Sequence, residues 1–464
     1  MPLKDHQIKD LPPAPSIKKL IGPSFILLGL GLGSGEVILW PYLTSNFGMG
    51  IIWGAILGIT LQFFMNMEIE RYALARGESV FVGFARKVKW LPIWFLLSTF
   101  IPWIWPGIAA SSAKLIGSLF GIEETSYLAI GMLILMGLIL SLGPILYKTV
   151  ERFQKTLIVV GVPLIFILTT LLAKQGHWID LAQGLAGKGI DYWFLPIGLP
   201  VASFLAAFAY SGAGGNLNLA QSFYIKEKGY GMGKYAGRIT SLLTGKVEDI
   251  SLAGAKFSHT PESLKNFGQW WKNINIEHFV VFWLTGSMTI LLLALLSYIT
   301  TFGAEGTSAG INFVLLEARA IGVLLFPLAG TAFLLVAGAT LFGTQLTVFD
   351  ATSRIISENV ILSSPDKLNE KKLPAIYYAV LWIQIFAGIT VLLFGFTEPL
   401  QLLVLAAVLN AFAMFVHVGL TLWLNKTSLE APLRPRLVRT TMMILAFILY
   451  GGFSIYTITT QFFR

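Results

Sequence analysis

A single carboxylate lies in a glycine-rich stretch of an otherwise apolar segment. The stretch reads GLGLGSGEVILWP from Gly29 to Pro41, and apolar residues continue on both sides of it, over residues 21–47. Glu36 is therefore near the middle of a segment long enough to cross a bilayer, where a carboxylate is expensive and marks a functional site. Non-helical backbone at this depth is tolerated only where protein buries it or water hydrates it. The first candidate site is therefore Gly33, Ser34, Gly35 and Glu36.

A second apolar segment is interrupted in the same way. It reads LAAFAYSGAGGNLNLAQSFY over residues 205–224, with three glycines and two asparagines near its middle. A pair of glycine-interrupted spans at matching places in two halves of a chain is the best sequence pointer to a transporter's binding site. The candidate residues here are Tyr210, Ala213, Gly214, Gly215 and Asn216. The competing interpretation is that the glycines only allow helices to approach closely.

Two interrupted helices offer defined chemistry. Each exposes unpaired C=O groups, which bind cations, and unpaired N–H groups, which bind anions. Glu36 adds a full negative charge, and Ser34 and Asn216 add neutral oxygens; Glu36 and Asn216 are the candidate metal ligands. Oxygen ligands without a nearby methionine or histidine favour a hard ion such as magnesium or manganese over iron or copper.

The elements that position these residues are expected to be membrane-spanning helices. Hydrophobic residues make up 55% of the 464 residues, charged residues only 12%, and the mean hydropathy is +0.73. These values indicate an integral membrane protein with a tail over residues 1–20 and one transmembrane domain over residues 21–464. We predict eleven spans, at about 21–47, 50–70, 92–120, 126–146, 154–173, 194–224, 278–301, 320–350, 375–396, 399–424 and 438–461. The stretch over residues 226–275 lacks a compact apolar pattern and is predicted to be a partly ordered loop.

The distribution of basic residues predicts the orientation. If the N-terminus is cytoplasmic, 28 of the 33 Lys and Arg residues fall on the cytoplasmic side. With eleven spans, this orientation places the C-terminus outside the cell. The membrane is expected to be the inner (plasma) membrane. It also explains the net charge of +9 through contact with anionic lipid, without a nucleic-acid partner. The tail has no apolar region followed by a small-residue cleavage site, so we expect no signal peptide.

The two interrupted spans are the first members of two successive sets of five. An odd number of spans per set makes the second set enter the membrane inverted. We therefore predict an inverted repeat, with the first unit at about 21–173, the second at about 194–424, and an extra helix at about 438–461.

Several segments resemble the Nramp family of divalent metal transporters. They are GPSF at Gly22, VERFQKTLIVVGVPLIF in the fifth predicted span, QLTVFDATSRIISENV in the eighth and LLVLAAVLNAFAMFVHVGL in the tenth. The resemblance covers nearly the whole chain. It implies an all-α membrane protein with a LeuT-type fold, a 5+5 inverted repeat and one extra helix. The family's metal-binding motifs are replaced here by Gly33–Glu36 and Ala213–Asn216, so the chain looks like a divergent member without the family's metal-selecting methionine.

Other charged residues inside or beside the spans are candidates for proton coupling. Besides Glu36 they are Lys114 and His417; Lys114 could snorkel outward instead, and His417 could be a packed residue. Glu68, Glu70 and Arg71 end the second span and are interpreted as a cluster at the inner membrane interface. Asp350 and Arg354 are spaced for an ion pair along one helix.

These features favour a secondary transporter of a divalent cation by alternating access, with proton symport as a candidate mechanism. The alternative is a LeuT-type transporter of an amino acid or other small carboxylate, since Gly33, Ser34 and Gly35 also look like the Gly-Ser-Gly turn of such proteins. The expected partners are a small inorganic cation or small organic solute, protons and the lipid bilayer. No catalytic or nucleotide-binding motif is present, so we expect that the protein is not an enzyme and needs no cofactor. We also expect a monomer.

Overall fold

The computed structural model describes residues 5–16, 23–142, 146–237 and 251–462. These residues form helices almost throughout, and their one sheet is a parallel pair of two-residue strands, β1 (Gln7–Ile8) and β2 (Ala255–Lys256). The helices up to the second interruption are α1 (Pro23–Gly31), α2 (Trp40–Phe47), α3 (Trp53–Arg76), α4 (Val80–Lys87), α5 (Leu91–Trp103), α6 (Gly107–Leu119), α7 (Ser126–Leu142), α8 (Leu146–Leu172), α9 (Gln175–Leu185) and α10 (Val201–Ala209). After it come α11 (Gln221–Lys228), α12 (Pro261–His278), α13 (Thr285–Thr301), α14 (Asn312–Leu324), α15 (Pro327–Ser363), α16 (Leu373–Leu393), α17 (Pro399–Ser428) and α18 (Leu437–Phe462).

The chain is an integral membrane protein with multiple apolar spans. Within the described residues, nine helical segments are long and apolar enough to cross a bilayer. Two other predicted spans do not meet that criterion: α7 has only 17 residues, and the segment from α10 to α11 is interrupted. The predicted number of eleven spans therefore stays a prediction.

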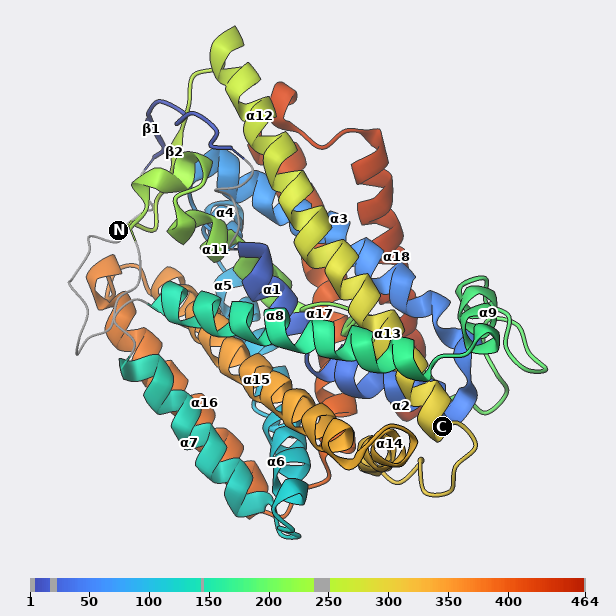
Figure 1. The fold of residues 1–464 in the computed structure, drawn as a ribbon. Helices are drawn as coiled ribbons and strands as arrows, with labels where there is room; N and C mark the ends of the chain where they lie inside the picture. Colours follow the sequence, from blue (N-terminus) through green and yellow to red (C-terminus); the bar gives the residue numbers. More distant parts are fainter. Residues whose placement is uncertain (1–4, 17–22, 143–145, 238–250, 463–464) are drawn as a thin grey trace.

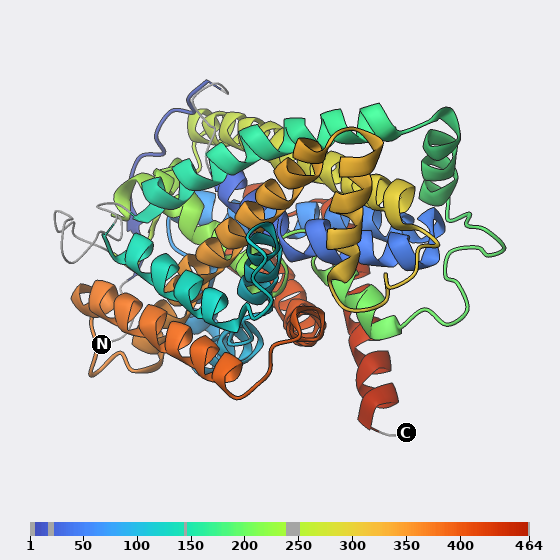
Figure 2. The same ribbon diagram turned by 60° about the horizontal axis from the view of Figure 1, so that its bottom comes forward.

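The long helix α15 runs through the middle of the bundle. It packs against α5, α6, α8, α14 and α16, and Figure 1 shows α8 crossing beside it and the pair α7 and α16 flanking it. Figure 2 shows α18 projecting from the opposite part of the bundle, with its C-terminal end away from the other helices. The short helices α1, α10 and α11 lie inside this frame, which buries most of their residues.

The N-terminal tail is bound along one end of the bundle, which we call the tail side. Besides the pairing of β1 with β2, three side chains of α12 donate hydrogen bonds to tail carbonyl oxygens. Asn266 donates to Pro12 at 2.9 Å, Trp270 to Pro12 at 2.7 Å and Asn273 to Pro15 at 2.9 Å. Residues 12–15 of the tail are thus attached to α12.

A buried carboxylate anchors the beginning of the tail. Glu78, between α3 and α4, accepts hydrogen bonds from Tyr72 at 2.7 Å and Arg86 at 3.0 Å, and its Oε1 lies 3.0 Å from Nε2 of His6. Burial opposes ionisation of Glu78, but the hydrogen bond from His6 and the charge of Arg86 outweigh it and lower its pKa to about 2. The tail is therefore held by a permanently ionised group at neutral pH.

The prediction of a loop over residues 226–275 is wrong for its last third. Thr260 caps α12 by accepting a hydrogen bond from the Ser263 N–H, and Pro261 occupies the first turn, where a missing N–H costs nothing. The helix continues through a π-helical turn at Phe279–Leu284 into α13, which makes one segment of 41 residues. Residues 238–250 of the predicted loop lie outside the described part of the chain.

Candidate site at the junction of two interrupted helices

The first interruption lies where the glycines predicted it. Helix α1 ends at Gly31, and the chain passes through Gly33, with φ −99° and ψ −108°, into a π-helical turn over Ser34–Leu39 before α2 begins. Single π-helical turns are rare and concentrate at functional sites. Ser34, Gly35 and Glu36 therefore lie on backbone that is not α-helical, between two helical halves.

The second interruption is also confirmed. Helix α10 ends at Ala209, and α11 begins only after a 3₁₀ turn over Gly215–Ala220. Gly214 and Gly215 have φ values of 73° and 58°, in the left-handed region that favours glycine. Any other residue at these two positions would strain the connection.

The two interruptions touch each other. A Cβ atom built on Gly35 would lie 1.7 Å from the carbonyl oxygen of Tyr210, and one built on Gly31 would lie 3.0 Å from Cα of Gly212. Backbone thus packs against backbone at two points, which only glycine permits. The two interruptions thus face each other in the structure.

Glu36 is fully buried beside this junction. Neither carboxylate oxygen has a hydrogen-bond partner within the described residues. A Cβ built on Gly286 of α13 would lie 3.6 Å from Oε1 of Glu36, and the same point is near side-chain carbons of Leu28 and Ile59. An ionised carboxylate in these apolar surroundings is costly unless a cation or a proton neutralises it.

Asn216 lies on another side of the junction. Its Nδ2 donates to Ser98 Oγ at 2.8 Å and to Thr99 Oγ1 at 3.0 Å, both on α5, and its Oδ1 has no partner in the described part of the chain. Among the described residues, no hydrogen bond joins Asn216 to Glu36. Within the described residues no group of three or more His, Asp or Glu side chains is placed to hold a metal ion.

Gln62 of α3 spans the second interruption, and the sequence analysis did not single it out. Its Nε2 donates to the carbonyl oxygen of Ala209 at 2.9 Å, and its Oε1 accepts from the Gly214 N–H and from Asn218 Nδ2, both at 3.3 Å. One side chain thus satisfies backbone groups on both sides of the gap. A buried amide in the middle of an apolar span was the signal that could have identified it.

Helix α17 covers the junction from another direction. Nε2 of His417 lies 3.0 Å from the carbonyl oxygen of Gly215, and Asn410 donates to the hydroxyl of Tyr210 at 2.9 Å. The Tyr210 ring stacks on Trp103 of α5, with ring centroids 5.6 Å apart. The predicted candidate His417 is thus in contact with the second interrupted helix. Asn410 contacts it too, but the sequence analysis did not single it out.

Lys114 lies elsewhere. It lines a polar cavity of about 240 Å³ together with Glu123, Glu124, Asn312 and Glu398, where α6, α7, α14 and α17 approach one another. Within the described residues no hydrogen bond or ion pair joins Lys114 to Glu36. The structure therefore gives no contact that would make Lys114 a partner of the buried carboxylate.

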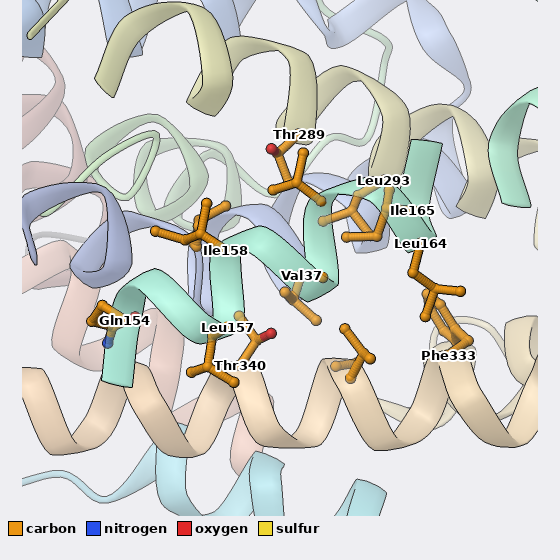
Figure 3. A pocket seen from close by; sticks show the side chains of 15 residues that line it. Val37, Gln154, Leu157, Ile158, Leu164, Ile165, Thr289, Leu293, Phe333 and Thr340 are labelled. Atoms are coloured by element: carbon orange, nitrogen blue, oxygen red, sulfur yellow. The ribbon is translucent and has the colours of Figure 1, made fainter. Parts of the chain in front are cut away.

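The site is closed in this structure. The cavity next to it, seen in Figure 3, has a volume of only about 20 Å³ and lies between α8, α13 and α15. Its lining is apolar apart from Gln154, Thr289 and Thr340. Gln154 itself donates to the carbonyl oxygen of Gly343 at 2.7 Å, and Thr344 donates to the carbonyl oxygen of Gly29 at 2.9 Å, so α8 and α15 hold α1 against them.

Comparison with solved structures identifies the fold. A mutant of the manganese transporter of Eremococcus coleocola superposes with a TM-score of 0.70 over 98% of this chain and 90% of that chain, at 14% sequence identity. The same transporter in complex with an aromatic bis-isothiourea substituted compound gives 0.67 with the same coverage and identity. Mhp1, a nucleobase-cation-symport-1 family transporter, gives 0.51 over 97% of this chain and 95% of that chain, at 13% identity. No family model and no curated protein matches the sequence.

These neighbours confirm the LeuT-type fold and the structural resemblance to the manganese transporter. The sequence identity of 14% shows that this chain has diverged far from that transporter. They are transporters and not enzymes, in agreement with the expectation from the sequence.

Proposed function

We propose that the chain is a secondary transporter that carries a hard divalent cation, magnesium or manganese, by alternating access between the two interrupted helices. The observation that supports this most is Glu36, a buried carboxylate without a hydrogen-bond partner in the described residues, next to two helix interruptions in contact. Such a carboxylate needs a positive partner, and a substrate cation supplies one.

The remaining ligands would come from neutral oxygens of the same junction. Oδ1 of Asn216 and Oδ1 of Asn218 are buried without partners in the described part of the chain. Hard divalent ions take six or more oxygen ligands. Since Glu36 faces α13 and Asn216 faces α5, we infer that the two interruptions shift relative to each other when the ion binds.

The basic residues support an orientation with the tail side in the cytoplasm. In that orientation α1 and α11 are the cytoplasmic halves of the interrupted helices, and α2 and α10 are the outer halves. The polar cavity around Lys114 then opens toward the outside. Lys114 is interpreted as part of that cavity and not of the ion site.

The direct test is uptake of magnesium and manganese into proteoliposomes by the intact chain and by Glu36→Gln. We expect the substitution, which keeps the size of the side chain but removes its charge, to lower uptake at least tenfold. Glu317→Gln is the matched control, because Glu317 of α14 is also a buried carboxylate with an oxygen that lacks a partner in the described residues. Equal uptake by the intact chain and Glu36→Gln would remove Glu36 from the site.

The alternative substrate is an amino acid, whose ammonium group would pair with Glu36 while Leu28 and Ile59 contact its apolar part. Its carboxylate would need the N–H groups of the interruptions, of which the Gly214 N–H is already bound to Gln62. Thermal stabilisation of the purified protein distinguishes the two. A rise in melting temperature with amino acids, and none with divalent cations, would favour the alternative.

A further inference from the structure

A second buried polar cluster lies on the tail side, where α1, α3, α11 and α12 meet. Glu70 of α3 and His278 of α12 are its centre, with Nδ1 of His278 3.0 Å from Oε1 of Glu70. Gln221, at the start of α11, donates to the same Oε1 at 2.7 Å, and Ser24, in the first turn of α1, lies 2.9 Å from Nδ1 of His278. One charged pair thus joins both tail-side halves of the interrupted helices.

The cluster is excluded from water. Glu70 and His278 have no exposed surface, and the His278 ring stacks on Phe282 at a centroid distance of 4.8 Å and packs against Phe63 at 5.6 Å. Oε2 of Glu70 and Nε2 of His278 have no hydrogen-bond partner within the described residues. Each of these two atoms can therefore bind a proton, and no surrounding side chain among the described residues donates one to them.

Within the described part of the chain, few other charged groups face this pair. From α12, Glu277 accepts a hydrogen bond from Ser24, and Tyr230, after α11, interacts electrostatically with Glu70, with Glu277 and with Glu151 of α8. On α3, Arg71 is bound to Glu68 at 2.8 Å, and Arg439 of α18 lies 3.5 Å from Glu68. Helix α1 contributes no charged residue. Arg439 also interacts electrostatically with Glu70, but within the described residues the only cation in direct contact with Glu70 is His278 when protonated.

Protonation changes the energy of this arrangement. With a neutral imidazole, Glu70 is a buried carboxylate held only by neutral donors, which costs several kcal/mol relative to water. With an imidazolium the same contact becomes a buried ion pair that joins α3 to α12, while Gln221 and Ser24 tie α11 and α1 to it. A proton therefore stabilises the closed tail side more than an open one, in which water would solvate Glu70.

We propose that Glu70 and His278 form a proton-binding site, separate from Glu36, that holds a proton while the tail side is closed and releases it when α1 and α11 move apart. The proton leaves the imidazolium for water, and only the N–H bond breaks. The inference rests on the proposed transport function, because it assigns α1 and α11 to the opening. It adds the proton as a second ligand and names where it binds.

The test measures opening without any metal. The chain has no cysteine, so Ala220→Cys, at a buried position next to α11, gives a single thiol that a maleimide reaches only when the tail side opens. Labelling rates are measured from pH 5 to 8 and divided by those of Thr427→Cys, an exposed position at the end of α17, to correct for thiol ionisation. We expect the corrected rate to rise with pH by up to about tenfold per pH unit, the limit for release of one proton.

Two substitutions in the Ala220→Cys background identify the groups. His278→Gln and Glu70→Gln should each flatten the pH profile. If one variant misfolds, the other still tests the pair. His259→Gln, at a partly exposed histidine 3.6 Å from Glu430, should keep the profile. A flat profile or no labelling in the parent, or an unchanged profile in both cluster variants, would overturn the proposal. Because no metal is present, failure of metal uptake and failure of this inference are read separately.

Discussion

Substitution of Gly35 by alanine tests the contact on which the site is built. The added Cβ would lie 1.7 Å from the carbonyl oxygen of Tyr210 and 2.6 Å from its carbonyl carbon, whereas real Cβ atoms are essentially never closer than 3.0 Å to a neighbour. The two segments would therefore have to separate by more than 1 Å, and both partners are backbone, which cannot rotate away.

The size of the effect follows from this geometry. Overpacking of a well-packed interior costs about 1–3 kcal/mol, and more where backbone must move. Replacement of glycine in a helical position by alanine returns only about 0.4–1 kcal/mol. We expect Gly35→Ala to lower the free energy of unfolding by at least about 2 kcal/mol. For a chain of this length that corresponds to a fall in melting temperature of roughly 2–4 °C.

The assay is thermal unfolding in detergent together with cation uptake, with Gly131→Ala as the matched control. Gly131 lies in α7, and a Cβ built there meets nothing within 4 Å. The control should keep or slightly raise the melting temperature and leave uptake unchanged, whereas Gly35→Ala should lose uptake at least tenfold. If Gly35→Ala unfolds within 1 °C of the parent and still transports, the close approach of the two interruptions is not what forms the site.

Three further predictions concern other parts of the molecule. Gln62→Ala should destabilise the chain by about 3 kcal/mol or more, since it leaves three buried polar groups unpaired at about 1–3 kcal/mol each; calorimetry checks this, and a loss under 1 kcal/mol would contradict the bridging role. Because the folded-state pKa of Glu78 is lowered to about 2, its stabilising effect should be complete above about pH 4.5 and disappear as the pH falls toward 2. Its full size is about 3 kcal/mol. Protease resistance of the tail in Glu78→Gln and the parent, compared from pH 2 to 7, measures it, and a difference that grows as the pH falls would refute the assignment. Lys114→Met should keep cation uptake within twofold, and a loss of tenfold would instead place Lys114 in the ion path.

The sequence predicted the interruptions because their cause is local. Glycines in the middle of apolar segments weaken a helix wherever it lies, so the ends of α1 and α10 could be anticipated without knowledge of their neighbours. The ion pair of Arg354 with Asp350, at 2.9 Å, is likewise a matter of spacing along one helix. The contact of Gly35 with the carbonyl oxygen of Tyr210, in contrast, joins two distant segments and was not predicted.

The residues that the sequence did not reveal have partners far along the chain. Gln62 bonds to groups about 150 residues away, and Glu70 meets His278 over a separation of more than 200 residues. Glu68, Glu70 and Arg71 were interpreted as one cluster at the membrane interface, but the structure divides them: Glu68 pairs with Arg71, while Glu70 turns to His278. Spacing along a helix cannot show which of two neighbouring carboxylates faces a distant element.

Helix α12 was missed because its sequence is too polar for a span. The cap at Thr260, with Pro261 and Glu262 after it, marks a helix start, and the apolar residues Phe267, Trp270 and Ile274 form one buried face. Its partner is the N-terminal tail, whose own sequence has no regular pattern. Helix packing is usually recognised from matching apolar patterns in both partners. Here only α12 has such a pattern.

Because α12 continues into α13, a movement at one end of this long helical segment can be transmitted to the other end. The 41 residues from Pro261 to Thr301 extend over roughly 60 Å, and the π-helical turn at Phe279–Leu284 is a natural pivot. One arm carries the tail and begins among exposed residues, and the other carries Gly286 past the Glu36 carboxylate. An antibody fragment bound to α12, on the tail side, would therefore act on the wall of the site from a distance, and could be used to trap single conformations.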